Sequence, residues 1–67
     1  MKLSVNDTPR EVKEGCTLQQ LLNELELGTT GGTAAAVNGQ VIPRKEWNEC
    51  TLHEHDDILI IKATQGG

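Results

Sequence analysis

Apolar and polar residues alternate at the start of the chain. Residues 2–6, KLSVN, follow the two-residue period of a half-buried strand. Residues 6–9, NDTP, are rich in turn formers. A second strand is expected over residues 10–13, with Glu14 and Gly15 ending it.

The clearest helical pattern covers residues 17–27. One face of this segment carries leucines at positions i, i+3, i+4 and i+7, namely Leu18, Leu21, Leu22 and Leu25. Thr17 can cap the helix, and Gln20 stands three residues later, as in a capping box. Gly28 is a suitable C-terminal stop. A helix this short must be stabilised by packing its leucine face against another element.

An Asn-Gly pair in the middle of the chain predicts a hairpin. Asn38 and Gly39 separate the apolar segments 34–37, AAAV, and 40–42, QVI, and Asn-Gly is the strongest short hairpin signal. Pro43 should end the second of these strands, because proline has no N–H to donate to a ladder.

The run Ile58-Leu59-Ile60-Ile61 predicts a strand at the centre of a sheet, where both faces are normally covered. One short helix can cover only one face. We therefore expect Ile58 and Ile60 to point inward and Leu59 and Ile61 to remain partly exposed, as a candidate docking patch. The alternative is that residues 44–55 fold over this patch.

These elements predict an α+β domain, with one main helix packed on one face of a mixed sheet of four or five strands. Residues 1–62 would form the domain and residues 63–67 a flexible tail that ends in Gly66-Gly67. The chain has no apolar stretch near the roughly 20 residues of a membrane span, and its N-terminus is unlike a signal peptide. With no C-x-x-C pair among its two cysteines, we expect a cytoplasmic protein.

The charge pattern argues against nucleic-acid binding. The net charge is −4, and the single aromatic residue is Trp47, whereas nucleic acid favours basic surfaces with stacking aromatics. Trp47 is interpreted as a packing anchor, or alternatively as a partner contact. A cluster of acids is interpreted as a solvated edge, or as a patch that steers the chain toward a basic partner: Glu46, Glu49, Glu54, Asp56 and Asp57.

Two further groups of side chains could carry chemistry. His53 and His55 would share one face of a strand and could bind a metal with a neighbouring carboxylate, although an ordinary polar turn is favoured. Cys16 lies at the start of the predicted helix, where the dipole could lower its pKa. The simpler interpretation of Cys16, and of Cys50, is a small half-buried residue. No nucleophile or paired-carboxylate motif is present, so we expect no enzyme and no bound cofactor or metal.

The last five residues, ATQGG, form an unusual tail. Extended from the end of a central strand, residues 63–67 could reach about 16 Å. Gly66 and Gly67 carry no side chain that would block a narrow channel. The reactive group at the tip would be the α-carboxylate of Gly67, which becomes a good electrophile once an ATP-using partner converts it to an acyl-adenylate. The alternative is a simple frayed end.

Several stretches resemble the thiamine-biosynthesis sulfur carrier proteins, a bacterial family with the ubiquitin-like β-grasp fold. They are VNDTPREV, TLQQLLNEL, AVNGQVIPRKEW, HEHDDILIIKA and the final QGG, and they cover nearly the whole chain in the family's order and spacing. The glycine-rich segment GTTGGT departs from the family's pattern.

The resemblance implies a function and its partners. A ubiquitin-activating-like enzyme would use ATP to adenylate Gly67, a persulfide-derived sulfur would convert it to a thiocarboxylate, and thiazole synthase would take the sulfur. Gly66 would be the unhindered residue before the sulfur bearer, and Gln65 with the two residues before it would be spacer. The sulfur would come from a cysteine desulfurase or a similar donor, and the free carrier would be a monomer.

Three alternatives remain open at this point. The small subunit of molybdopterin synthase shares the fold and the Gly-Gly end. A ubiquitin-like modifier would join Gly67 to a lysine, and an interaction module would leave it unreacted. A metal-binding domain centred on His53 and His55 is the weakest alternative.

Overall fold

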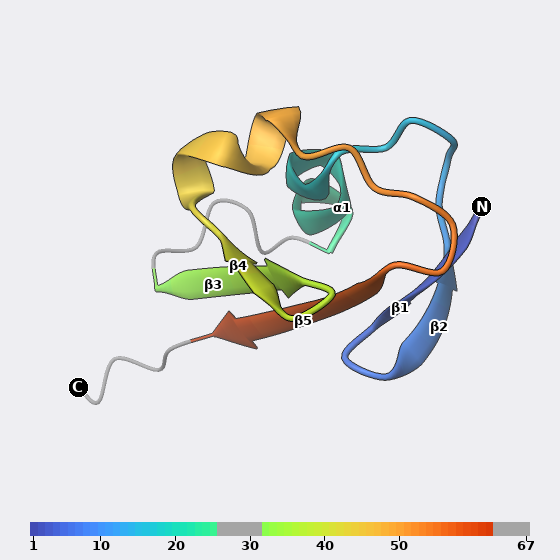
Figure 1. The fold of residues 1–67 in the computed structure, drawn as a ribbon, viewed down its shortest axis with the longest axis horizontal. Coiled ribbons are helices and arrows are strands. Elements are labelled where there is room, and N and C mark those ends of the chain that lie inside the picture. The colour runs from blue at the N-terminus through green and yellow to red at the C-terminus, as the bar shows by residue number, and fades with distance from the viewer. Residues whose placement is uncertain (26–31, 63–67) are drawn as a thin grey trace.

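The computed structural model describes residues 1–25 and 32–62 (Figure 1). Its elements, in chain order, are β1 (Lys2–Val5), β2 (Thr8–Glu11), α1 (Leu18–Glu24), β3 (Thr33–Val37), β4 (Gln40–Ile42), the 3₁₀ helix η1 (Arg44–Glu49) and β5 (Asp57–Lys62).

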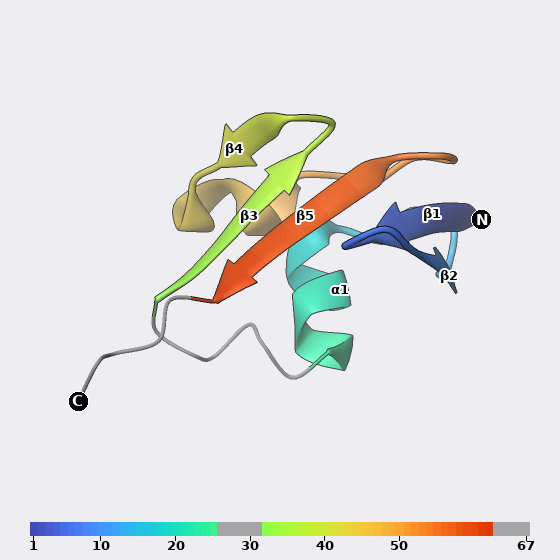
Figure 2. The same ribbon diagram turned by 90° about the horizontal axis from the view of Figure 1, so that it is seen from below.

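The five strands form one mixed sheet in the order β2-β1-β5-β3-β4. β5 is central, parallel to β1 and antiparallel to β3. Figures 1 and 2 show α1 and η1 on the same side of the sheet, with no helix across the other side in the part of the chain that is described. The predicted α+β architecture, one helix on one face of a mixed sheet, is confirmed.

The first hairpin is tighter than the sequence pattern indicated. Its turn consists of Asn6 and Asp7 alone, both left-handed with φ of 51° and 68°. This two-residue turn lets β2 begin at Thr8, so the prediction of a strand over residues 10–13 was wrong by two positions. Pro9 is accommodated inside β2 because this strand lies at the sheet edge, where a missing N–H costs no ladder bond.

The start of α1 follows the predicted capping box. The hydroxyl of Thr17 accepts a hydrogen bond from the backbone N–H of Gln20 at 3.2 Å, and the Gln20 side chain accepts one from the N–H of Thr17 at 3.0 Å. The regular helix ends at Glu24, with Leu25 as its C-cap. The remainder of the predicted helix and its stop at Gly28 lie outside the described residues.

The helix η1 is an element that the sequence pattern did not predict. It places Trp47 in the core, 1% exposed, where the indole N–H donates to the carbonyl of Ile42 at 2.8 Å. The Arg44 guanidinium lies 4.9 Å above the indole ring. Trp47 is therefore a packing anchor, and η1 covers the α1 side of the sheet instead of the opposite face.

The core lies between α1, η1 and the inner face of the sheet. Its fully buried side chains are Leu18, Leu21, Leu22, Trp47, Leu52 and Ile58. Ile58 and Ile60 on β5 are 0% and 8% exposed, whereas Leu59 and Ile61 are 49% and 56% exposed. The predicted alternation of this strand is confirmed, and residues 44–55 do not cover its outer side chains.

Candidate functional site: the end of β5 and the open face of the sheet

β5 ends at Lys62, opposite Thr33 of β3, so the chain leaves the domain from the middle of the sheet. The arrowhead of β5 points away from the end of the molecule that holds the N-terminus (Figures 1 and 2). The predicted tail, with Gln65, Gly66 and Gly67, lies outside the described residues, and its role as sulfur bearer stays a prediction.

The open face carries an apolar patch next to this exit. It consists of Leu59 and Ile61 on β5 and Val41 on β4, which is 69% exposed. Val41 pairs with Ala36, and Ala36 pairs with Leu59, so the side chains of Val41, Ala36 and Leu59 form one row across β4, β3 and β5. Ile61 lies two residues further along β5, on the same face. The small side chain of Ala36 leaves a shallow hollow between its larger neighbours.

Val41 is a member of this patch that sequence reasoning missed. One signal in the sequence, the alternation along its strand, could have found it. Val41 alternates with Ile42 in a strand that follows the Asn-Gly turn, and Ile42 packs against the core. Since successive side chains point to opposite faces, Val41 must face outward. The patch is defined here as Val41, Leu59 and Ile61. It is a docking candidate because neighbouring exposed apolar side chains are uncommon on a small domain.

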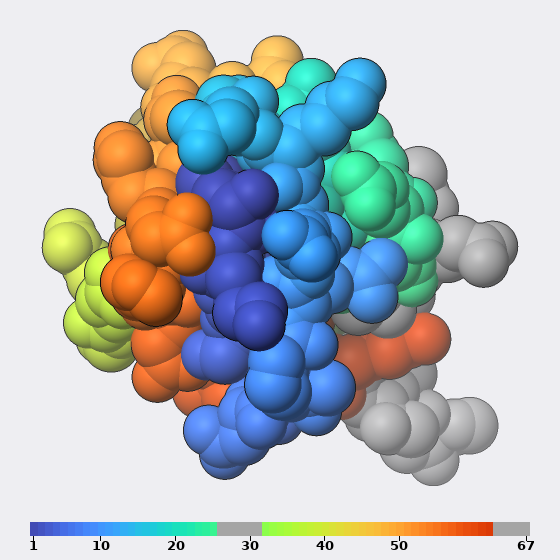
Figure 3. All heavy atoms as spheres, turned by 90° about the vertical axis from the view of Figure 1, so that its right-hand side faces the viewer, coloured from blue at the N-terminus to red at the C-terminus, as the bar shows by residue number. Residues whose placement is uncertain are grey.

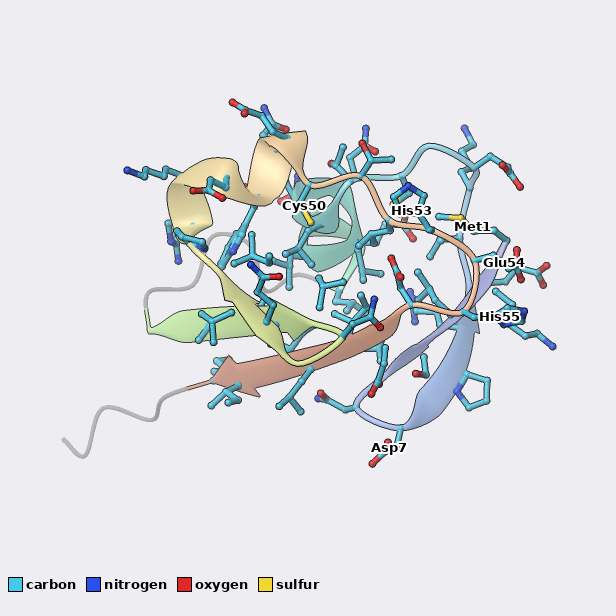
Figure 4. All side chains as sticks on the ribbon, in the orientation of Figure 1. Met1, Asp7, Cys50, His53, Glu54 and His55 are labelled. Carbon is cyan, nitrogen blue, oxygen red and sulfur yellow. The ribbon has the colours of Figure 1, made fainter. Side chains whose placement is uncertain are left out.

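The loop before β5 arranges the two histidines as the favoured interpretation of a polar turn expected, and not as a pair on one strand face. His53 and His55 lie in a turn, with His55 at φ 69°, so they do not share one face of a strand. His55 donates its backbone N–H to the carbonyl of Lys2 at 2.7 Å. Figures 3 and 4 show this loop against β1, at the end that holds Met1. Within residues 1–25 and 32–62, no three His, Cys, Asp or Glu side chains come together as a metal site.

Asp56 is internal rather than part of an acidic surface. It is 8% exposed, and its carboxylate accepts from the backbone N–H of His53 at 2.7 Å and from the Asn38 side chain at 2.9 Å. A carboxylate with two such donors organises the loop that leads into β5. The other acids of the predicted patch lie at separate places: Glu46 and Glu49 on η1, Glu54 in the loop, and Asp57 at the first position of β5. Whether they steer the chain toward a basic partner stays a prediction.

The two cysteines are free thiols. Cys16 is buried, and burial together with the nearby Glu24 carboxylate raises the pKa of its thiol. The suggestion that the helix dipole lowers this pKa is therefore wrong, because desolvation disfavours the thiolate. Burial also raises the pKa of Cys50, with Asp56 and Glu46 adding to the effect. Neither thiol has the environment of a nucleophile.

The sequence was compared with the models of known protein families. The model of the ThiS family matches residues 3–67. The chain belongs to the ThiS family. The match runs from Leu3 in β1 to the last residue, so it includes both the patch and the glycine tail. Of the two sulfur-carrier alternatives, this match favours the thiamine branch over the molybdopterin branch.

Individual relatives agree with this assignment. The chain is 31% identical to the sulfur carrier protein ThiS of Escherichia coli (strain K12), over all of both chains. It is also similar to the crystal structure of the thiamine biosynthesis protein ThiS from Geobacter metallireducens, with a TM-score of 0.84, 26% identity and full coverage of both chains. A solution structure of a thiamine biosynthesis protein from that organism gives a TM-score of 0.80 at 26% identity, covering all of this chain and 88% of the other.

Membership of the ThiS family confirms the β-grasp prediction and the prediction that the chain is a carrier and not an enzyme. Among the helices that the structure describes, none has the length and apolar character needed to cross a membrane.

Proposed function

We propose that the chain is a sulfur carrier of thiamine biosynthesis and that the α-carboxylate of Gly67 bears the sulfur. The observation that carries the proposal is the family match through residue 67, which joins the glycine tail to a β-grasp domain whose central strand ends five residues earlier.

The chemistry requires an activated carboxylate. An adenylating partner, similar to ubiquitin-activating enzymes, transfers AMP from ATP to the Gly67 carboxylate and releases pyrophosphate. The terminal sulfur of a persulfide donor then attacks the acyl-adenylate and displaces AMP, which leaves an acyl disulfide between Gly67 and the donor. A thiol of the donor or of an added reductant attacks this disulfide, forms a new disulfide with the donor sulfur and releases the thiocarboxylate. Thiazole synthase takes this sulfur into the thiazole ring. ATP is thus a substrate of the partner, and the carrier itself binds no cofactor.

The proposed docking surface is the patch of Val41, Leu59 and Ile61. Its position beside the end of β5 lets one contact hold the domain while the tail extends into the partner's site. Burying such side chains contributes about 25 cal/mol per Å² of apolar surface, which makes this face the main candidate source of binding energy. The adenylating enzyme and thiazole synthase would each dock on this face, one after the other.

The test is ATP–pyrophosphate exchange by the adenylating partner, with the carrier as the second substrate. Deleting Gly67 should abolish exchange, because the remaining tail no longer brings a carboxylate to the reacting position. Circular dichroism and the melting temperature should stay unchanged, since the tail follows the last strand of the domain.

The matched control is Thr64→Ala, which keeps the length of the tail and changes only a spacer side chain. It should support exchange within about a factor of three of the unmodified chain. Undiminished exchange with the Gly67-deleted chain would contradict the proposal. Transfer of the intact chain to a lysine of another protein would favour the ubiquitin-like modifier.

A further inference from the structure

Two asparagines hold β5, one on each side of the strand. Asn38, in the turn after β3, donates its backbone N–H to the carbonyl of Asp57 at 2.8 Å, and its side-chain oxygen accepts from the N–H of Asp57 at 2.9 Å. Asn6, in the turn after β1, donates its backbone N–H to the carbonyl of Ile58 at 2.9 Å. Both asparagines have φ of 51°, a left-handed conformation that asparagine tolerates better than most residues.

The side chain of Asn6 continues the ladder where β1 stops. β1 pairs with β5 only through Ser4↔Asp57 and Val5↔Ile58. One step further along β5, Oδ1 of Asn6 accepts from the N–H of Ile60 at 2.8 Å, and Nδ2 donates to the carbonyl of the same residue at 3.3 Å. A carboxamide presents one donor side and one acceptor, as a peptide group does. The side chain therefore stands in for the next peptide of β1.

The location of this contact separates it from the contact made by Asn38. Asn38 binds the first residue of β5, and Ile60 lies two residues before its end at Lys62. Ile60 is paired with Ala35 of β3 on the opposite side of the strand. With Asn6 in place, the last part of β5 is held from both sides. Without it, the described residues hold this part from the β3 side only.

We infer that Asn6 is a positioning residue for the reaction at the C-terminus. By fixing Ile60, it sets the direction of the end of β5, to which the tail is attached. A tail whose root can pivot loses more conformational freedom when it enters a narrow site, and this loss weakens productive binding. The inference rests on the proposed function, because only a reaction at Gly67 makes this direction matter.

The test compares Asn6→Gly with Asn38→Gly. Glycine adopts positive φ without steric cost, so each substitution removes a carboxamide without straining its turn. Asn38→Gly is the matched control, because it removes a side-chain clamp from the other end of the same strand. Both variants are assayed by ATP–pyrophosphate exchange at one temperature, well below their melting temperatures.

We expect Asn6→Gly to lower kcat/KM for the carrier about three- to ten-fold, mainly through a higher KM, as when about one further residue must be ordered on binding. Asn38→Gly should stay within about two-fold of the unmodified chain. Asn6→Asp keeps an acceptor for the Ile60 N–H and loses the donor, so its decrease in kcat/KM should be intermediate. It replaces Asn6→Gly in the comparison if that variant does not fold. Equal effects of the two glycine variants would overturn the inference.

Hydrogen exchange of the Ile60 amide supplies a readout that needs no partner. The rate should rise in Asn6→Gly and not in Asn38→Gly, because only Asn6 accepts from this N–H. If the unmodified chain is adenylated but hydrogen exchange at Ile60 is unchanged in Asn6→Gly, the inference is overturned and the proposed function stands. Absence of any adenylation of the unmodified chain, with an active partner, would overturn the proposed function and this inference with it.

Discussion

Ile58 and Leu59 are adjacent on the central strand and of similar size, but their environments are opposite. Ile58 is fully buried in the core cluster that includes leucines of α1 and Trp47 of η1, whereas Leu59 is 49% exposed on the opposite face. A central strand with both faces apolar normally has helices on both sides. Here the described residues leave the second apolar face open. One side of β5 therefore stabilises the domain, and the other is the surface proposed for recognition.

The largest effect should come from the buried side. Ile58→Ala should lower the free energy of unfolding by about 3 kcal/mol, because it removes a fully buried side chain and leaves a cavity. For a domain of this size, that is a large part of a total stability of roughly 3–10 kcal/mol. Urea unfolding followed by circular dichroism measures the change. A loss below about 1 kcal/mol would show that the covered side of β5 contributes little to the free energy of unfolding, against this account.

Leu59→Asp should change the free energy of unfolding little and weaken partner binding strongly. Its effect on the free energy of unfolding should stay within about 1 kcal/mol, since the side chain is half exposed. Binding to the adenylating partner, measured by isothermal titration calorimetry, should weaken about tenfold or more, because a charge would occupy the apolar patch.

Gln40→Asp is the control for this experiment. It introduces the same charge at an exposed position of β4, and alternation places its side chain on the opposite face from Val41. It should leave the affinity within about a factor of two. If Leu59→Asp unfolds the domain, or binds as tightly as the control does, the open face is not the recognition surface.

A smaller effect on stability should come from Cys16, on the covered side of the sheet, at high pH. Burial and the Glu24 carboxylate raise the pKa of Cys16 above the ordinary thiol value of 9.0. The thiol of the unfolded chain therefore loses its proton first, and stability falls as the pH rises above 9.0. Below that pH the contribution of the neutral thiol is fully present.

Melting temperatures measured from about pH 7 to about pH 10 test this expectation. Cys16→Ala should reduce the decline above pH 9.0, and Cys50, whose pKa is raised in the same direction, should account for part of what remains. An identical decline in Cys16→Ala and the unmodified chain would show that Cys16 does not titrate in this range and that the covered side is less dry than the structure indicates.

Local signals predicted most of the fold. The capping box at Thr17, the Asn-Gly turn at Asn38 and the alternation along β5 each depend on a few neighbouring residues, and the structure contains all three. The start of β2 was missed because Pro9 is a turn former that an edge strand also accepts. The helix η1 was missed because its six residues are too short to show a period, and only the burial of Trp47 fixes them.

The candidate site was less predictable, because its parts meet only through pairing across the sheet. Leu59 and Ile61 were found from their own strand, but Val41 joins them only through Ala36 on the strand between. Asp56 looked like a surface acid, but its buried carboxylate accepts a hydrogen bond from Asn38, eighteen residues away in sequence. The contact of Asn6 with Ile60 spans fifty-four residues, a separation that no sequence period reveals.

Intact mass spectrometry tests the central claim most directly. The chain is incubated with its adenylating partner, ATP, a persulfide donor and a thiol reductant, and its mass is compared with that of a sample lacking ATP. The account predicts a mass gain equal to the exchange of one oxygen for sulfur, located at Gly67 by fragmentation. An unchanged mass, while the same partner loads another carrier of the family, would contradict the account.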